Sequence, residues 1–318
     1  MAQRSNIPVL LSLLIIVLFT VATTSTLNFS KEKMLEVEQD LHSIKEQLYA
    51  SVSSFSRIIP NKEEGVVLTP TWINQAGYNT QERFILPKGY KREESEIGTF
   101  AYFLRNLSLK DHGSPVLLYN GKRKANNIYE AVVSMDIGKK DLQQCADAII
   151  RLRAEYLYQE KKYEKINFSF TNGFEASFDK WIEGNRIKVI KDKVFWEKVA
   201  EKGNNYDIFR EYLEMVFIYA GTMSLEKDLV PVDYKDMEIG DVFIQGGSPG
   251  HAVIVFDLAV NHLGEKVYLL AQSYMPAQEI HILQNPNNSS PWYLLDEKDS
   301  IIKTPEWTFS ADNLKRFP

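Results

Sequence analysis

Cys145 is the only cysteine among the 318 residues, and it lies near the start of a predicted helix over about 141–160. Asp141 is a favourable N-cap residue, and Gln144 three positions later completes a capping box. This spacing places the thiol in the first helical turn, where backbone N–H groups and the helix dipole favour a thiolate. The sequence therefore predicts that the pKa of Cys145 lies below the ~8.5 of a free thiol and that the residue can act as a nucleophile.

An apolar stripe along the same helix supports a second interpretation. A cysteine on such a stripe is often a small buried hydrophobic residue without a chemical role. The residues that share this stripe with Cys145 are Leu142, Ala146, Ile149, Leu152 and Tyr156. The helix alone leaves both interpretations open.

His251 is the histidine best placed to act as a base. It follows the glycine- and proline-rich turn of "GSPGHAVIVFD" and opens a predicted strand over 251–257. The segment "LAVNHLGE" predicts a hairpin to a second strand over 267–273. Gln272 would then lie roughly opposite His251, where its amide oxygen can accept the imidazole N–H and fix the tautomer. Ser273 takes this place if the register shifts by one, and a purely structural histidine is the alternative.

The N-terminal residues predict export. Arg4 precedes an apolar run over 7–22, so residues 1–25 resemble a secretory signal peptide or a short membrane anchor, with a buried helix as the alternative. Apolar residues then recur at heptad spacing, which predicts a helical stalk or linker over 26–60, followed by a single domain over 61–318. We therefore expect a periplasmic or cell-envelope protein whose membrane contact is made only through the N-terminal segment.

Export makes an unpaired thiol unusual. Exported proteins generally hold their cysteines in disulfides, and a single cysteine cannot form one within the chain. Cys145 is therefore expected to be a buried inert residue, an intermolecular link or a reactive nucleophile.

The composition excludes several functional classes. The net charge of −5 gives no electrostatic basis for binding nucleic acid. The sequence contains no HExxH, paired CxxC, P-loop or dinucleotide fingerprint, so we expect neither a metal nor a cofactor. Four tryptophans could line a glycan-binding cleft, although such residues more often fill a core. They are Trp181, Trp196, Trp292 and Trp307.

The order of predicted elements is typical of an α+β fold. Helical apolar spacing appears over 98–109 and over about 205–222. The C-terminal third changes to consecutive strands separated by glycine- and asparagine-containing turns, which predicts an antiparallel meander.

A cysteine heading a helix, a histidine opening a strand and a polar residue on the next strand together resemble papain-like thiol hydrolases. The order is most similar to that of the NlpC/P60 group, in which the strand before the histidine often starts with Gly-Asp, here Gly240–Asp241. This resemblance implies a papain-like fold with the nucleophile-bearing helix packed on an antiparallel sheet. The chain has Gln-Cys-Ala where that group usually has Asp-Cys-Ser.

Nearly all of the predicted exported part also resembles DUF4846, a bacterial family of unknown function. The phrases that carry this resemblance are "DLQQCADAIIRLRAEYLY", "GSPGHAVIV", "LLAQSYMPAQEIHIL" and "PEWTFSADNLKRF".

These patterns lead to the hypothesis of an exported cysteine hydrolase, a peptidase or amidase that acts on a peptide or peptidoglycan-like substrate. Cys145 would attack the carbonyl carbon, His251 would transfer the proton and Gln272 would orient His251. Backbone N–H groups at the helix start, with Gln144, would stabilise the oxyanion. One alternative is a non-catalytic envelope protein that binds a glycan or a protein partner through a papain-like frame, and another is a purely structural surface protein.

Overall fold

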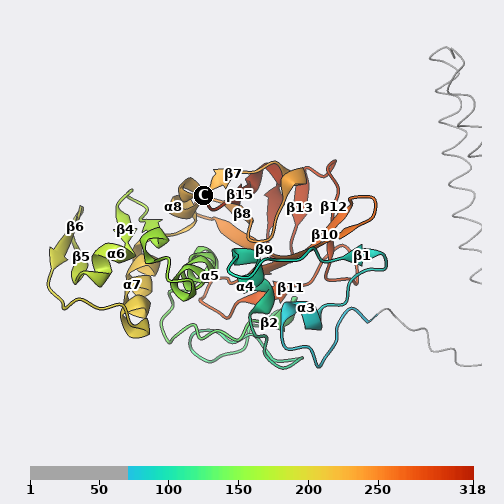
Figure 1. The fold of residues 1–318 in the computed structure, drawn as a ribbon, viewed down its shortest axis with the longest axis horizontal. Helices are drawn as coiled ribbons and strands as arrows, with labels where there is room; N and C mark the ends of the chain where they lie inside the picture. Colours follow the sequence, from blue (N-terminus) through green and yellow to red (C-terminus); the bar gives the residue numbers. More distant parts are fainter. Residues whose placement is uncertain (1–70) are drawn as a thin grey trace, which may run out of the picture. The chain divides into compact units, whose positions relative to one another are not determined.

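The computed structural model describes residues 71–318 (Figure 1). The predicted signal or anchor segment, 1–25, and the predicted stalk, 26–60, lie outside the described residues. From residue 71 onward, no helix has the length and apolar character needed to cross a membrane.

An antiparallel sheet is the largest element of the fold, and the described residues contribute nine strands to it. The strands on its main path are, in spatial order, β2 (Tyr129–Val132), β11 (His281–Leu283), β10 (Lys266–Gln272), β9 (His251–Asn261), β8 (Val242–Gln245), β15 (Leu314–Arg316) and β7 (Val230–Pro231). In addition, β1 (Tyr90–Lys91) pairs with β9, and β12 (Tyr293–Leu295) pairs with β10. Helices and an antiparallel sheet together give the α+β class that the sequence predicts.

Two hydrophobic cores lie on the two faces of β9. Its sequence "HAVIVFDLAV" is nearly all apolar and rich in β-branched residues, which favour strands. Because successive strand side chains point to opposite faces, Ile254 and Phe256 join the core that contains α5, whereas Val253 and Val255 join a second core. This burial on both faces explains why β9 lacks the apolar–polar alternation of a half-exposed strand.

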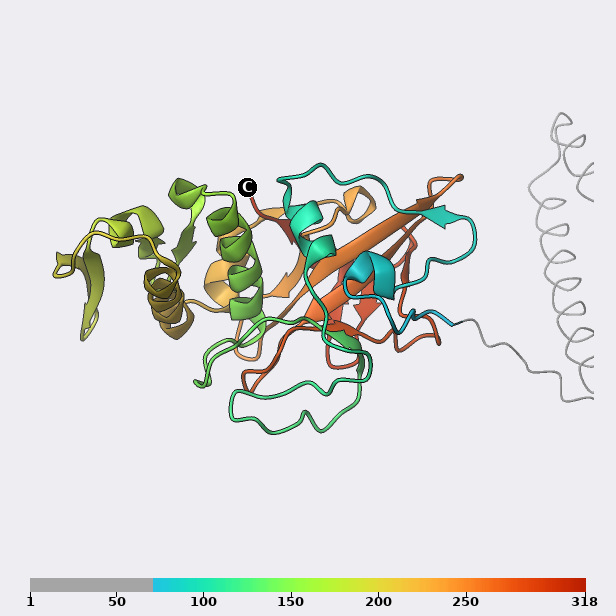
Figure 2. The same cartoon turned by 60° about the horizontal axis from the view of Figure 1, so that its bottom comes forward.

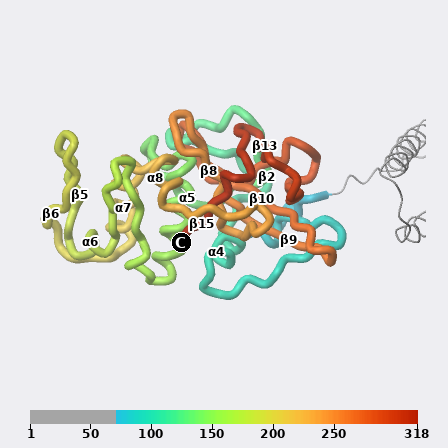
Figure 3. Tube along the Cα trace, turned by 90° about the horizontal axis from the view of Figure 1, so that it is seen from above, coloured from blue at the N-terminus to red at the C-terminus, as the bar shows by residue number. Residues whose placement is uncertain are grey.

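The helix α5 (Cys145–Gln159) packs against β9, and α4 (Phe100–Asn106) lies beside it on the same strand. A smaller lobe covers the other side of α5, so this helix stands between the sheet and the lobe (Figure 2). The hairpin of β5 (Asn185–Ile190) and β6 (Lys193–Lys198) forms the end of the lobe farthest from the sheet (Figure 3). The lobe contains β3 (Asn167–Ser169), β4 (Glu175–Ser177), α6 (Phe178–Ile182), β5 (Asn185–Ile190), β6 (Lys193–Lys198), α7 (Tyr206–Tyr219) and α8 (Thr222–Asp228).

Two further short elements lie at the ends of the described part of the chain, besides the 3-10 helices Tyr163–Lys165, Tyr234–Asp236 and Ala311–Asn313. They are α3 (Thr80–Arg83) near the start and the hairpin of β13 (Ile301–Lys303) and β14 (Thr308–Ser310) before β15.

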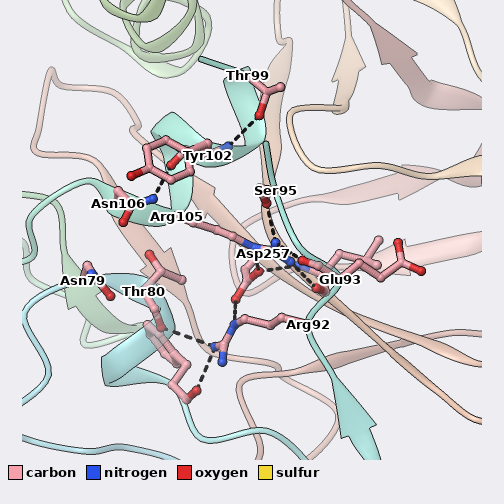
Figure 4. A network of polar contacts seen from close by, with 12 residues as sticks. Asn79, Thr80, Arg92, Glu93, Ser95, Thr99, Tyr102, Arg105, Asn106 and Asp257 are labelled. Atoms are coloured by element: carbon pink, nitrogen blue, oxygen red, sulfur yellow. Dashed lines mark hydrogen bonds and ion pairs between the residues drawn. The ribbon is translucent and has the colours of Figure 1, made fainter. Parts of the chain in front are cut away.

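A buried carboxylate fixes the segment before α4 to the middle of β9. Asp257 has a fully buried side chain, and its two oxygens accept from Arg92 Nε at 2.6 Å and from Arg105 Nε at 2.7 Å (Figure 4). Arg105 Nη2 also donates to the carbonyl oxygen of Leu258 at 2.8 Å. A buried charge is tolerated when it is paired and hydrogen-bonded, so these contacts make Asp257 a structural anchor.

The start of α5 differs from the prediction. Asp141 and Leu142 lie before the helix, Gln144 is the N-cap residue and Cys145 is the first helical residue. Asp141 does not cap the helix because its Oδ1 accepts the backbone N–H of Ala277 at 2.6 Å. The predicted box at Asp141 and Gln144 is therefore wrong by three positions.

The predicted hairpin is present and longer than expected. β9 extends from His251 to Asn261, and β10 runs from Lys266 to Gln272. The helix predicted over about 205–222 is α7, which runs from Tyr206 to Tyr219, and a separate helix, α8, starts at Thr222 after Gly221.

Candidate active site

Cys145 lies in a groove of about 460 Å³ at the N-terminus of α5. The residue is largely buried, with 7% of its surface exposed. Besides the thiol, the groove is lined by Asp141, Gln144 and Asp147 around the helix start, by Thr222 and Met223 of α8, by Gly250 before β9 and by Met275 after β10. A small substrate group that entered this groove would meet the thiol.

The environment raises the pKa of the Cys145 thiol to about 11. Burial is the largest cause, followed by the negative charge of Asp147. The backbone amides of Ala146, Ala252 and Cys145 itself act in the opposite direction, as expected at a helix N-terminus, but desolvation outweighs them. The predicted lowering of this pKa is therefore wrong for this structure.

Asp147 is a buried acid in the first turn of α5. Its Oδ2 accepts the backbone N–H of Gln144 at 3.0 Å, whereas Oδ1 has no hydrogen-bond partner among the described residues. Burial raises the pKa of Asp147 to about 8, so the carboxyl group is mostly protonated at neutral pH. A protonated Asp147 does not repel a thiolate, and its influence on Cys145 therefore grows only as the pH rises toward 8.

His251 opens β9 and is bound by the residue predicted to orient it. His251 Nε2 lies 2.8 Å from Gln272 Oε1, and both side chains are buried. The imidazole is enclosed by the rings of Tyr274, Trp307 and Phe309, at centroid distances of 4.9, 5.5 and 6.0 Å. Burial is the main cause that lowers the pKa of His251 to about 4, so the ring is neutral at physiological pH.

The thiol and the imidazole approach the start of β9 from different sides. His251 packs on Phe309, which belongs to the second core, whereas α5 packs on the opposite face of the sheet. The sulfur is close to the strand itself, because the backbone amide of Ala252 acts on the thiol. Within residues 71–318, no hydrogen bond joins Cys145 Sγ to the imidazole, and none involves His251 Nδ1.

Tyr274 interacts with both the His251 imidazole and the Cys145 thiol. Its ring contacts the edge of the imidazole, and the charge of Cys145 is one of the causes that raise the pKa of Tyr274, after burial and the charge of Glu306. The start of β9 therefore brings the nucleophile candidate and the base candidate into one neighbourhood without a direct hydrogen bond.

A glycine allows the loop before His251 to pack closely. A Cβ atom added at Gly250 would lie 2.5 Å from Thr222 Oγ1 and 2.7 Å from the carbonyl oxygen of Gly247. Such distances are shorter than real Cβ contacts, so only glycine lets the loop pack this closely on α8. The loop in turn fixes where β9 begins and hence the position of His251.

The other predicted site residues have different positions. Gln144 lines the groove, and its Nε2 donates to Asp141 Oδ1 at 3.2 Å. Ser273 does not replace Gln272, because its Oγ lies 2.7 Å from the carbonyl oxygen of Gln278 and 3.2 Å from that of Gln143. Gln272 is the last residue of β10, and Ser273 follows it outside the strand.

Asp241 of the Gly-Asp pair is a structural residue. Its Oδ1 accepts from Arg316 Nε at 2.6 Å, and its Oδ2 accepts the backbone N–H of Glu238 at 2.8 Å. These contacts hold the start of β8 against β15. Both carboxylate oxygens of Asp241 are therefore used in structural hydrogen bonds.

The four tryptophans do not line one cleft. Trp181 and Trp292 are buried in the first core, with 3% and 2% of their surface exposed. Trp196 lies on the β5–β6 hairpin, where Lys180 contacts its ring. Only Trp307 reaches the candidate site, where it packs on His251.

Three residues around Gln272 have no counterpart in the sequence analysis, and neither do Asp147 and Tyr274. Glu306 Oε2 accepts from Gln272 Nε2 at 2.6 Å, and Lys124 Nζ pairs with the same carboxylate at 2.8 Å. His281 Nε2 lies 3.4 Å from Gln272 Nε2. Glu306 belongs to the quoted phrase "PEWTFSADNLKRF", but no local spacing connects it with Gln272, so no sequence signal assigns it a role.

No group of three or more histidine, cysteine, aspartate or glutamate side chains in residues 71–318 is placed to hold a metal ion. The sequence model of DUF4846, a domain of unknown function, matches residues 80–316. Comparisons with curated proteins and with solved structures find no match.

Proposed function

The chain belongs to the DUF4846 family, and we propose that it is an exported cysteine hydrolase, a peptidase or amidase that acts on peptides of the cell wall. Its fold would be a papain-like variant of the α+β class, with α5 carrying the nucleophile. Export rests on Arg4 and the apolar run over 7–22.

In the proposed reaction, Cys145 Sγ forms a bond to the carbonyl carbon of the substrate while His251 Nδ1 takes the thiol proton. The backbone N–H of Cys145, with the Gln144 side chain, stabilises the oxyanion. His251 then gives the proton to the leaving amine as the C–N bond breaks. Water attacks the resulting thioester with His251 again as the base, which releases the acid and restores the thiol.

One observation carries the proposal, the hydrogen bond from His251 to Gln272 at 2.8 Å. This bond occupies Nε2 and leaves Nδ1 as the nitrogen that can accept a proton. His251 is thus a neutral, oriented base, and Gly250 directly before it lines the groove that contains the only thiol.

The ionisation states favour a neutral resting pair. With a thiol pKa of about 11 and an imidazole pKa of about 4, neither Cys145 nor His251 is charged at pH 7. Proton transfer would then accompany attack, as it does in serine–histidine sites, and the substrate must bring the thiol and the base into contact.

Purified full-length protein incubated with peptidoglycan fragments provides the test, with released peptides and amines measured by chromatography and mass spectrometry. We expect hydrolysis by the wild type and none by Cys145→Ala or Cys145→Ser. Equal product formation by wild type and Cys145→Ala would show that Cys145 is not the nucleophile.

A non-catalytic envelope protein is the second candidate function. It is favoured by the buried, protonated thiol and by the lack of a hydrogen bond between Cys145 and His251 within residues 71–318. In that case the groove would bind a glycan or a protein partner, and Cys145→Ala would retain binding of peptidoglycan fragments in calorimetry while no product appears with either protein.

A further inference from the structure

The side-chain amide of Gln272 lies at the centre of a buried polar chain. Its Oε1 faces His251 Nε2 at 2.8 Å. Its Nε2 faces Glu306 Oε2 at 2.6 Å and His281 Nε2 at 3.4 Å. The chemistry of these neighbours decides which end of the amide points to His251.

Glu306 imposes the first constraint. Lys124 Nζ lies 2.8 and 2.9 Å from its two carboxylate oxygens, and the Lys124 side chain is only 7% exposed. An ionised carboxylate can only accept hydrogen bonds. The amide atom of Gln272 that faces Glu306 must therefore be the NH₂ group.

His281 imposes the same constraint independently. Its Nδ1 lies 2.8 Å from the backbone carbonyl oxygen of Glu279, so Nδ1 carries a hydrogen and donates it. Burial, as the largest cause, lowers the pKa of His281 to about 3 and keeps the ring neutral. Its Nε2 is then a bare acceptor, which again requires the NH₂ group of Gln272 on that side.

With the NH₂ group held on one side, the amide oxygen of Gln272 faces His251. An oxygen cannot donate, so His251 Nε2 must carry the hydrogen and Nδ1 must be bare. We propose that Glu306, Lys124 and His281 are positioning residues that set the tautomer of His251 through Gln272. The two buried histidines consequently hold opposite tautomers, Nε2–H at His251 and Nδ1–H at His281.

This arrangement matters because only one imidazole nitrogen remains free to act as a base. A base in the wrong tautomer keeps its geometry but cannot take the nucleophile's proton. The catalytic meaning of this device rests on the proposed function, whereas the tautomers themselves do not require any activity.

The wild-type protein allows a direct test. With ¹⁵N-labelled histidine in full-length protein at pH 7, long-range ¹H–¹⁵N spectra distinguish protonated from bare ring nitrogens. We expect His251 as Nε2–H and His281 as Nδ1–H. Finding both in the same tautomer, or His251 as Nδ1–H, would overturn the proposal without any variant.

A matched pair of variants tests the cause. Glu306→Gln removes the charged acceptor at 2.6 Å and leaves only the 3.4 Å contact with His281 to hold the Gln272 amide, so His251 should populate the Nδ1–H form in part of the molecules. Glu279→Gln is the control, because it removes the partly buried ion pair with Lys110 while keeping the backbone carbonyl that holds His281. An unchanged His251 spectrum in folded Glu306→Gln would show that Glu306 does not set the tautomer.

The outcomes separate this inference from the proposed function. Opposite tautomers in a protein that hydrolyses nothing would support the positioning chain and reject the hydrolase. If hydrolysis occurs, Glu306→Gln should lower kcat by at least about tenfold and leave KM nearly unchanged, since Glu306 touches no substrate. A loss of the same size in Glu279→Gln would assign the effect to general destabilisation and overturn the positioning role.

Discussion

Asp147 Oδ2 accepts the backbone N–H of Gln144 at 3.0 Å and thereby caps α5 next to the nucleophile candidate. The same side chain is buried, its second oxygen has no hydrogen-bond partner in the described part of the chain, and its pKa is about 8. One carboxyl group therefore links the stability of the helix start to the ionisation of the thiol.

We expect Asp147→Asn to change how stability depends on pH. The folded pKa of Asp147 lies above its unfolded value, so the folded state holds its proton more tightly. Wild-type stability from this group is fully present below about pH 4 and is lost as the pH rises toward 8.

Asparagine at position 147 keeps an oxygen that can accept the backbone N–H of Gln144, and it does not ionise. The free energy of unfolding of wild type relative to Asp147→Asn should fall by up to about 1.4 kcal/mol per pH unit between pH 5 and 8. Urea unfolding at several pH values measures this, and parallel curves would contradict it.

Alkylation of the folded protein should report the raised thiol pKa of Cys145. Only the thiolate reacts with iodoacetamide, so below a pKa of about 11 the rate should rise roughly tenfold per pH unit from pH 6 to 10. The urea-unfolded protein is the control, and its rate should level off near pH 8.5–9. A plateau of the folded protein near neutral pH would instead show a depressed pKa and an ion pair with His251.

His251→Ala should abolish most hydrolysis without disturbing the groove. A general base contributes about 10²- to 10⁴-fold, so kcat/KM with peptidoglycan fragments should fall by that factor. His262→Ala is the control, since His262 is exposed in the turn between β9 and β10. A loss of activity in both variants, or in neither, would remove His251 from the mechanism.

Replacing Asp257 should destabilise the whole fold. Asp257→Asn leaves Arg92 and Arg105 without their buried carboxylate, which should cost about 3–5 kcal/mol of unfolding free energy. Glu214→Gln is the surface control, because its partner Lys140 is 65% exposed and such pairs contribute at most about 1 kcal/mol. Denaturant unfolding of the two variants distinguishes them, and similar losses would show that Asp257 is no special anchor.

Gly250→Ala should disturb the site through its backbone. The added Cβ would meet Thr222 Oγ1 and two carbonyl oxygens, so the loop must shift, at a cost of about 1–3 kcal/mol. The expected result is a lower melting temperature together with shifted ¹⁵N signals of His251. Gly221→Ala is the control, since a Cβ added there would have nothing within 4 Å and the expected cost is below about 1 kcal/mol. Unchanged His251 signals in Gly250→Ala would contradict the role of this loop.

The sequence identifies those parts of the site that depend on neighbouring residues. The order of Cys145, His251 and Gln272 follows from a helix start and a hairpin, and local patterns determine both. The predicted helix start is misplaced because Asp141 and Asp147 both fit a capping pattern. Only the tertiary contact between Asp141 and the backbone of Ala277 excludes the first of them.

Properties that depend on long-range contacts or on desolvation could not be predicted from the sequence. The pKa of Cys145 depends on burial, which a helix pattern cannot quantify, and the predicted direction is consequently wrong. The roles of Lys124 and Glu306 depend on contacts across the sheet. The predicted α+β class depends only on the order of helices and strands, and the structure confirms it.

The ion pair between Lys124 and Glu306 joins residues 182 positions apart. Contacts of such high sequence separation form slowly, because the entropy of closing a long loop is lost before the contact is gained. Cys145, His251 and Gln272 are all synthesised before Glu306. Until the β13–β14 hairpin docks, only the 3.4 Å contact with His281 would hold the Gln272 amide, so a partly synthesised or C-terminally truncated chain would fix the His251 tautomer less firmly than the complete fold does.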